Sequence, residues 1–217
     1  MKNLINVITT IMLAFAFTGC AYKAQVLSTS APVAEIQPDK QIDCTASYFI
    51  ESEIRDLAKD IKPSSYVCRV HTFPLEVGTA LKSSIVKVLE GTFANVTTAS
   101  SKTPSESDGR YKFIFSLDTF HPTLRFSQGF WQANIFANTE IVMKVMVTDA
   151  NGKEVVRTTI SGEGSADTGG LCGDGAQVLA DATQKAIKRT LENLVYKIIN
   201  SDYLASNPVK SIEGSMK

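Results

Sequence analysis

The central part of the chain alternates apolar and polar residues with a period of two, the pattern of a β-strand with one buried face. The alternation begins at Tyr111 and is strong again over residues 131–148. His121-Pro122 is expected to mark a turn between these strands. Asp149-Ala150-Asn151-Gly152 is a hairpin signal that leads into a further strand over residues 154–162. The pattern predicts three or four antiparallel strands.

Two longer segments carry apolar residues at helical spacing. The first covers residues 74–90, and the second, over residues 175–200, has the stripe Leu179, Thr183, Ile187, Leu191, Leu194 and Ile198. Shorter elements are expected before and between them: a helix over 50–61, strands over 45–49, 65–73 and 95–99, and a loop over 100–110. This order predicts an α+β domain over residues 41–202, with a single antiparallel-rich sheet and two main amphipathic helices packed on one face.

The first twenty residues have the pattern of an export signal. Lys2 precedes an apolar stretch from Leu4 to Phe17, and about 14 residues are too few to span a bilayer, which needs roughly 20. The segment Phe17-Thr18-Gly19-Cys20 resembles the lipobox of bacterial lipoproteins. The resemblance implies that residues 1–19 are removed and that Cys20 is acylated. Because Ala21 follows instead of Asp, it also implies sorting to the outer membrane, with the domain expected in the periplasm. The alternative is an ordinary secretory signal in which Cys20 occurs by chance.

Residues 20–40 are small, polar and interrupted by proline. They are expected to form a lipidated cysteine and a flexible tether that reaches about 60 Å when extended. Residues 203–217 are expected to form a flexible tail. The chain has 22 basic and 22 acidic side chains, and removal of Lys2 with the signal leaves a net charge of about −1. This balance excludes a typical nucleic-acid-binding protein, which carries a basic excess.

Export places the remaining cysteines in an oxidising compartment, where one disulfide and one free thiol are expected. Cys68 and Cys172 are the favoured pair, and Cys44 with Cys68 is the competitor. The cysteines lack the close spacing of a zinc site, so no metal is expected. No cofactor motif occurs, and the glycine-rich segment 162–175 is expected to be a mobile connector without a phosphate-binding signature.

Groups suited to catalysis are few. Asp167-Thr168-Gly169 matches the core motif of aspartic proteases, but it does not follow an apolar strand and has no second copy in the chain. His71 and His121 are the only histidines, and neither lies in a nucleophile motif. An enzyme would need a polar pocket that collects Asp118, His121, Asp167 or Asp174.

Aromatic residues are concentrated between positions 120 and 136, close to Arg125 and Gln128; they are Phe120, Phe126, Phe130, Trp131 and Phe136. Core packing is the favoured interpretation. The functional interpretation is an exposed apolar patch that contacts a protein partner or a lipid through Phe126, Phe130 and Trp131.

The chain resembles small envelope lipoproteins in its layout: a lipid anchor, a flexible spacer, a helix preceded by Leu75-Glu76-Val77-Gly78, an antiparallel block, an Asn-Gly hairpin and a closing amphipathic helix. Within the domain the similarity covers residues 64–200. Examples of such lipoproteins are the auxiliary lipoproteins of ABC transporters and the lipopolysaccharide-assembly lipoproteins. The resemblance implies a non-catalytic binding or assembly component of the cell envelope, held on the membrane by its lipid and associated with an envelope protein. A periplasmic enzyme and a structural surface lipoprotein are the alternatives.

Overall fold

The computed structural model describes residues 22–25, 41–103, 109–129, 132–200 and 204. Its strands are β1 (Ala24–Gln25), β2 (Ile42–Ile50), β3 (Ala58–Ile61), β4 (Phe73–Glu76), β5 (Phe93–Thr98), β6 (Tyr111–Ser127), β7 (Ala133–Asp149) and β8 (Glu154–Gly170). Its helices are α2 (Ser52–Arg55), α3 (Gly78–Thr92) and α4 (Gly175–Leu194). A 3-10 turn, η4 (Cys172–Asp174), precedes α4, and a π-helical turn, η5 (Val195–Ile199), follows it.

The described strands form two sheets, so the expectation of a single antiparallel-rich sheet is wrong. The larger sheet is mixed and has the order β5-β2-β6-β7-β8, and the smaller has the order β1-β4-β3. In the larger sheet β2 runs parallel to both β5 and β6, whereas β6, β7 and β8 are antiparallel. The physical reason lies in the connections. Strands joined by a tight turn must be antiparallel, whereas β2, β5 and β6 are joined by long connections, which allow them to pair in parallel.

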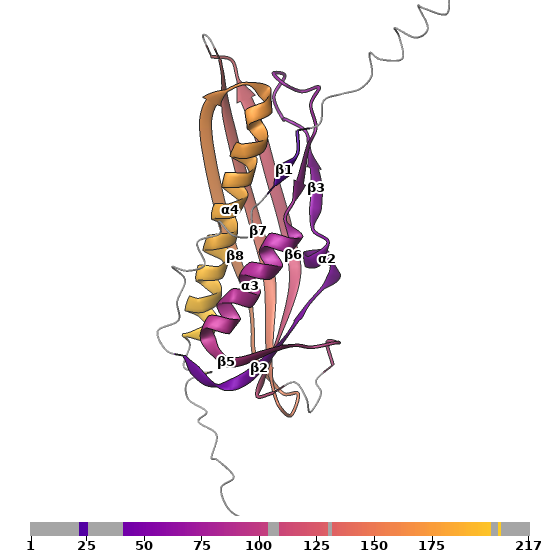
Figure 1. Cartoon of the computed structure of the whole chain (residues 1–217), viewed down its shortest axis with the longest axis vertical. Helices are drawn as coiled ribbons and strands as arrows, with labels where there is room; N and C mark the ends of the chain where they lie inside the picture. The colour runs from indigo at the N-terminus through magenta and orange to yellow at the C-terminus, as the bar shows by residue number, and fades with distance from the viewer. Residues whose placement is uncertain (1–21, 26–40, 104–108, 130–131, 201–203, 205–217) are drawn as a thin grey trace, which may run out of the picture.

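Strands β6, β7 and β8 have 17 residues each and run along the long axis of the molecule beside α4 (Figure 1). Gly152, at φ 77°, closes the β7–β8 hairpin, as the Asn-Gly signal predicts. His121-Pro122 is not a turn, because both residues lie within β6. Pro122 is tolerated there because β2 pairs only with Tyr111–Phe115, so this part of β6 has a paired strand on one side only within its sheet.

The glycine-rich segment is a strand up to Gly170, which corrects its interpretation as a mobile connector. Gly162 and Gly164 lie directly under α4. A Cβ atom on Gly164 would come within 2.0 Å of the carbonyl oxygen of Ala182, and one on Gly162 within 2.4 Å of that of Ala186. Glycine is required here because any side chain would push the helix away from the sheet.

Polar side chains of α4 and of the following turn η5 cover the free edge of β8. Four of them, each four residues after the last, donate hydrogen bonds to alternate carbonyl groups of the strand. The pairs are Lys185 with Ser165 (2.9 Å), Arg189 with Glu163 (2.7 Å), Asn193 with Ser161 (2.7 Å) and Lys197 with Thr159 (3.3 Å). We call this set the α4–β8 ladder. An exposed edge strand is prone to pair with other chains, and the ladder protects this edge.

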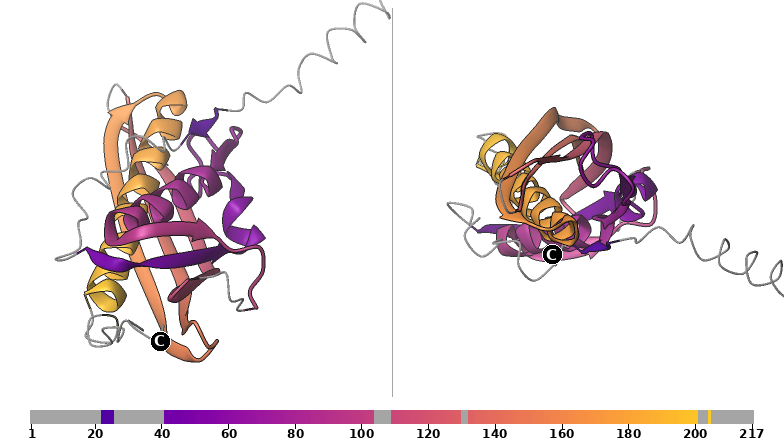
Figure 2. Two further views of the ribbon diagram at one scale, coloured as in Figure 1. Left: turned by 60° about the horizontal axis from the view of Figure 1, so that its bottom comes forward. Right: turned by 90° about the horizontal axis from the view of Figure 1, so that it is seen from above.

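The remaining helices and strands follow the predicted pattern less closely. α3 begins at Gly78 and not at Pro74, because Pro74–Glu76 belong to β4. The helix expected over 50–61 is only α2, and β3 occupies its second half. The strand expected over 65–73 is a series of turns up to its last residues, with Cys68 at φ 60°. Figure 2 shows α3, β2 and β5 crossing the long strands near one end of the molecule.

The N-terminal residues Tyr22–Gln25 are part of the domain. Tyr22 donates its backbone N–H to the carbonyl of Thr72 (3.1 Å), and Ala24, which is fully buried, pairs with Leu75 in a parallel register. The expectation of a flexible tether therefore fails for these residues, while residues 26–40 lie outside the described part of the chain. Of the expected tail, only Leu204 is described, and it is buried.

Substitution of Gly164 by Ala is predicted to destabilise the protein by about 1–3 kcal/mol, because the added methyl group overpacks the α4 interface. The measurement is the free energy of unfolding in urea. Gly91→Ala is the control: Gly91 lies in α3, and apart from the backbone of its own helix and its chain neighbours no heavy atom of the described residues comes within 4 Å of its Cβ position. This control should raise stability by about 0.5–1 kcal/mol, the helical preference of Ala over Gly. Equal effects of the two substitutions would contradict the close packing of α4 on β8.

Candidate functional site

Cys68 and Cys172 form a disulfide, which confirms the favoured pairing and excludes the Cys44–Cys68 alternative. The bond joins the turns after β3 to η4, at the start of α4. Cys44 is a free thiol in β2. Burial raises the pKa of this thiol, and Asp43 adds to the rise while Arg110 opposes it. A raised pKa means less thiolate at neutral pH, so Cys44 is not an activated nucleophile.

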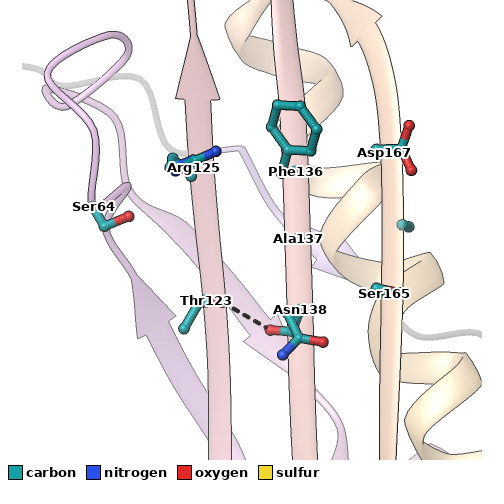
Figure 3. A pocket seen from close by; sticks show the side chains of 9 residues that line it. Ser64, Thr123, Arg125, Phe136, Ala137, Asn138, Ser165 and Asp167 are labelled. Atoms are coloured by element: carbon teal, nitrogen blue, oxygen red, sulfur yellow. Dashed lines mark hydrogen bonds between the residues drawn. The ribbon is translucent and has the colours of Figure 1, made fainter.

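The larger sheet has an open outer face, which we define as the face of β6, β7 and β8 that is turned away from α4. Strand alternation places every second side chain there, and the register brings them into rows across the three strands. One row joins Arg125, Phe136 and Asp167, and the next joins Thr123, Asn138 and Ser165. With Ser64 these residues line an open pocket of about 460 Å³, the outer-face pocket (Figure 3).

The first row combines a cation, an aromatic ring and an anion. The Arg125 guanidinium lies 5.5 Å from the centre of the Phe136 ring, a distance at which a cation–π contact contributes roughly 0.5–1 kcal/mol at an exposed site. Phe136 is 40% exposed, although large aromatic side chains are usually more deeply buried. Asp167 lies on the other side of Phe136 in the register. The pocket thus offers an apolar surface between two opposite charges.

The predicted aromatic patch has a different composition in the structure. Phe126 is 2% exposed and packs against Phe73, with ring centres 6.0 Å apart, so it cannot contact a partner. Phe130 and Trp131 lie outside the described residues. Phe136, which the sequence places in the same aromatic cluster, is the exposed member. Strand alternation accounts for its exposure: Ile135 and Ala137, its neighbours in β7, are buried, so Phe136 lies on the opposite face of the strand.

The acidic and basic groups considered for catalysis are spread along the molecule. His121 shares a row with Glu140 and Glu163, and Asp167 lies four residues further along β8, about 13 Å away along the strand. Asp118 forms an ion pair with Lys144. Asp174 accepts a hydrogen bond from the backbone N–H of Leu171 (2.7 Å). Asp167, His121 and Asp174 therefore do not share one pocket.

The described residues contain neither a cluster of metal ligands nor a membrane-spanning helix. No three His, Cys, Asp or Glu side chains among them lie close enough together to hold a metal ion. None of the described helices is both long enough and apolar enough to cross a membrane.

Comparison with known proteins gives distant structural likenesses. No protein-family model and no curated protein matches the sequence. Among solved structures, a minor lipoprotein from Acinetobacter baumannii is 9% identical, with a TM-score of 0.36 over 75% of this chain and 95% of that chain. The hypothetical protein CT253 from Chlamydia trachomatis is also 9% identical, with a TM-score of 0.43 over 77% of this chain and all of the other. At these scores neither likeness defines the fold or the function.

Loss of the disulfide in a Cys68→Ser, Cys172→Ser double variant is predicted to lower the free energy of unfolding by about 2–5 kcal/mol. The bond closes a long loop, since the two cysteines are 104 residues apart. Urea unfolding of the oxidised protein provides the measurement, with Cys44→Ser as the control because Cys44 is unpaired. A larger loss of stability in the control than in the double variant would refute this pairing.

Proposed function

We propose that this protein is a lipoprotein of the bacterial cell envelope that is tethered by acylated Cys20 to the outer membrane. It binds another envelope protein through the outer-face pocket and has no catalytic activity of its own. The anchor is supported by the apolar signal and the segment Phe17-Thr18-Gly19-Cys20. Export is further supported by the Cys68–Cys172 disulfide, since such bonds persist in oxidising compartments.

The row Arg125–Phe136–Asp167 is the observation that carries the binding role. Protein interfaces are enriched in aromatic residues and arginine, and their strongest contacts are anchors of these types. The pocket is open to solvent and not enclosed, which suits a protein segment better than a small molecule that must be surrounded on most sides. The flanking charges, Arg125 and Asp167, give the partner a fixed direction across the strands.

A non-catalytic role is supported by the separation of the acidic and basic groups. Catalytic groups must reach one reacting centre within hydrogen-bond distance, directly or through a water. His121 and Asp167 are about 13 Å apart along the strand direction alone.

The anchor is tested by Cys20→Ala in the full chain. The native protein is expected in the membrane fraction after export, because multiple acyl chains hold a protein durably, whereas the variant is expected in the soluble fraction. Cell fractionation with intact-mass analysis of the purified protein gives both readouts. A native protein that is soluble and has no added acyl mass would overturn the anchor.

The binding surface is tested by photo-crosslinking in intact cells with benzoylphenylalanine in place of Asn138. The matched control has the same label in place of Lys144, which lies on the same strand and face about 20 Å away. One defined envelope protein should be captured at position 138 and not at position 144. Equal capture at both positions, or none at either, would refute the proposed site.

The same crosslink measures the contribution of Phe136. Phe136→Ala is predicted to reduce capture at position 138 about 30-fold, the effect of losing an interface anchor worth about 2 kcal/mol. Folding should be retained because Phe136 is already partly exposed. Tyr196→Ala, at an exposed aromatic residue of η5, is the control and should leave capture unchanged. Unchanged capture in Phe136→Ala would show that the aromatic ring is not the anchor.

A further inference from the structure

Large apolar side chains are exposed around the disulfide at one end of the molecule. Tyr66 is 91% exposed, Val70 83% and Leu171 73%, and each lies within two residues of Cys68 or Cys172. We call residues 66–71 and 171–173 the disulfide apex. Exposed apolar side chains that cluster in this way mark an interaction surface, because water contact with them is unfavourable.

The apex is held in place by local bonds as well as by the disulfide. The backbone N–H of His71 donates to the carbonyl of Cys68 (3.0 Å). On the other side of the disulfide, Asp174 accepts from the N–H of Leu171 (2.7 Å). These contacts fix the backbone that carries the exposed side chains, so their exposure belongs to the folded structure.

The chain enters the domain at the same place. The Tyr22 ring stacks on Phe73 at 5.8 Å and meets the His71 ring edge-on at 5.1 Å between centres. A Cβ atom on Gly173 would lie 3.1 Å from the Tyr22 ring, so this ring contacts both halves of the apex. Cys20 is two residues before Tyr22, and two residues span at most about 7 Å. An acyl group on Cys20 therefore brings the bilayer surface to the apex.

The charge of the apex fits a phospholipid surface. Arg69 is the only charged residue between Ser64 and Phe73, and it is exposed. A cation among tyrosine and aliphatic side chains matches the headgroup region of a bilayer, where phosphate groups meet the acyl chains. Asp174, the acidic residue of η4 beside the apex, accepts a hydrogen bond from the backbone N–H of Leu171.

We propose that the disulfide apex rests on the lipid bilayer in which Cys20 is anchored, with Tyr66, Val70 and Leu171 in the headgroup region and Arg69 beside lipid phosphates. The long strands then stand away from the membrane. Asp167 lies about 13 Å along β8 from Leu171, so the outer-face pocket faces a partner close to the bilayer surface. This proposal rests on the lipid anchor of the proposed function.

The test uses tryptophan fluorescence of the full lipidated protein in vesicles of phosphatidylethanolamine and phosphatidylglycerol. Trp131→Phe removes the single native tryptophan, and Val70→Trp places a probe at the apex. The matched control is Tyr196→Trp, an exposed position in η5 about 30 Å away along α4. Lipids brominated near the headgroup end of their acyl chains act as the quencher.

Emission of the Val70→Trp protein is expected to fall about twofold in brominated vesicles, since interfacial side chains lie within roughly 5–10 Å of the headgroup–acyl boundary. Emission of the Tyr196→Trp protein should not change. Flotation of the same samples separates the two proposals. A protein that floats without quenching at position 70, or with equal quenching at both positions, overturns the apex contact alone. A protein that does not float overturns the anchor and the apex contact together.

Discussion

The contact between α4 and β8 is the interaction on which the rest of the structure depends. Four residues of an α-helix rise about 6 Å, and two residues of a strand about 6.7 Å, so a helix laid along a strand edge matches it over several steps. The α4–β8 ladder uses this match to place a polar side chain at alternate carbonyls of the edge. Gly162 and Gly164 let the two backbones approach closely enough. One sheet face and one sheet edge are thereby closed, and the outer face is left open.

The position of α4 also determines what lies at the two ends of the molecule. Its first residue follows η4, which carries Cys172, and the disulfide ties this end to the turns around Cys68. Tyr22 docks against both, so the N-terminal chain enters the domain beside the start of α4. If both proposals hold, one domain carries two surfaces, an apex for the membrane and a pocket for a protein partner. Their separation is set by the strand β8 that connects them.

Local patterns in the sequence predict the elements whose partners are close in the chain. The hairpin at Gly152, the closing helix α4 and the Cys68–Cys172 pair are all correct. The errors arise where distant partners decide. Glycines at 162–170 are typical of a loop, yet here they form a strand because a helix lies against them. A register irregularity between Leu117 and Thr119 in β6 changes which residues of this strand face the core, so Phe126 is buried. In β7 the odd-numbered residues face the core, so Phe136 is exposed. The two-residue strand β1 is too short to leave a periodic signal.

In the proposed arrangement the domain stands on the membrane by its disulfide end, without a long spacer between the two. Neutron reflectometry of the lipidated protein on a supported bilayer measures this arrangement directly. It should find protein density in contact with the headgroups and extending about 55 Å outward, the length of a 17-residue strand. A water-filled layer tens of ångströms thick between the headgroups and the protein would contradict this arrangement.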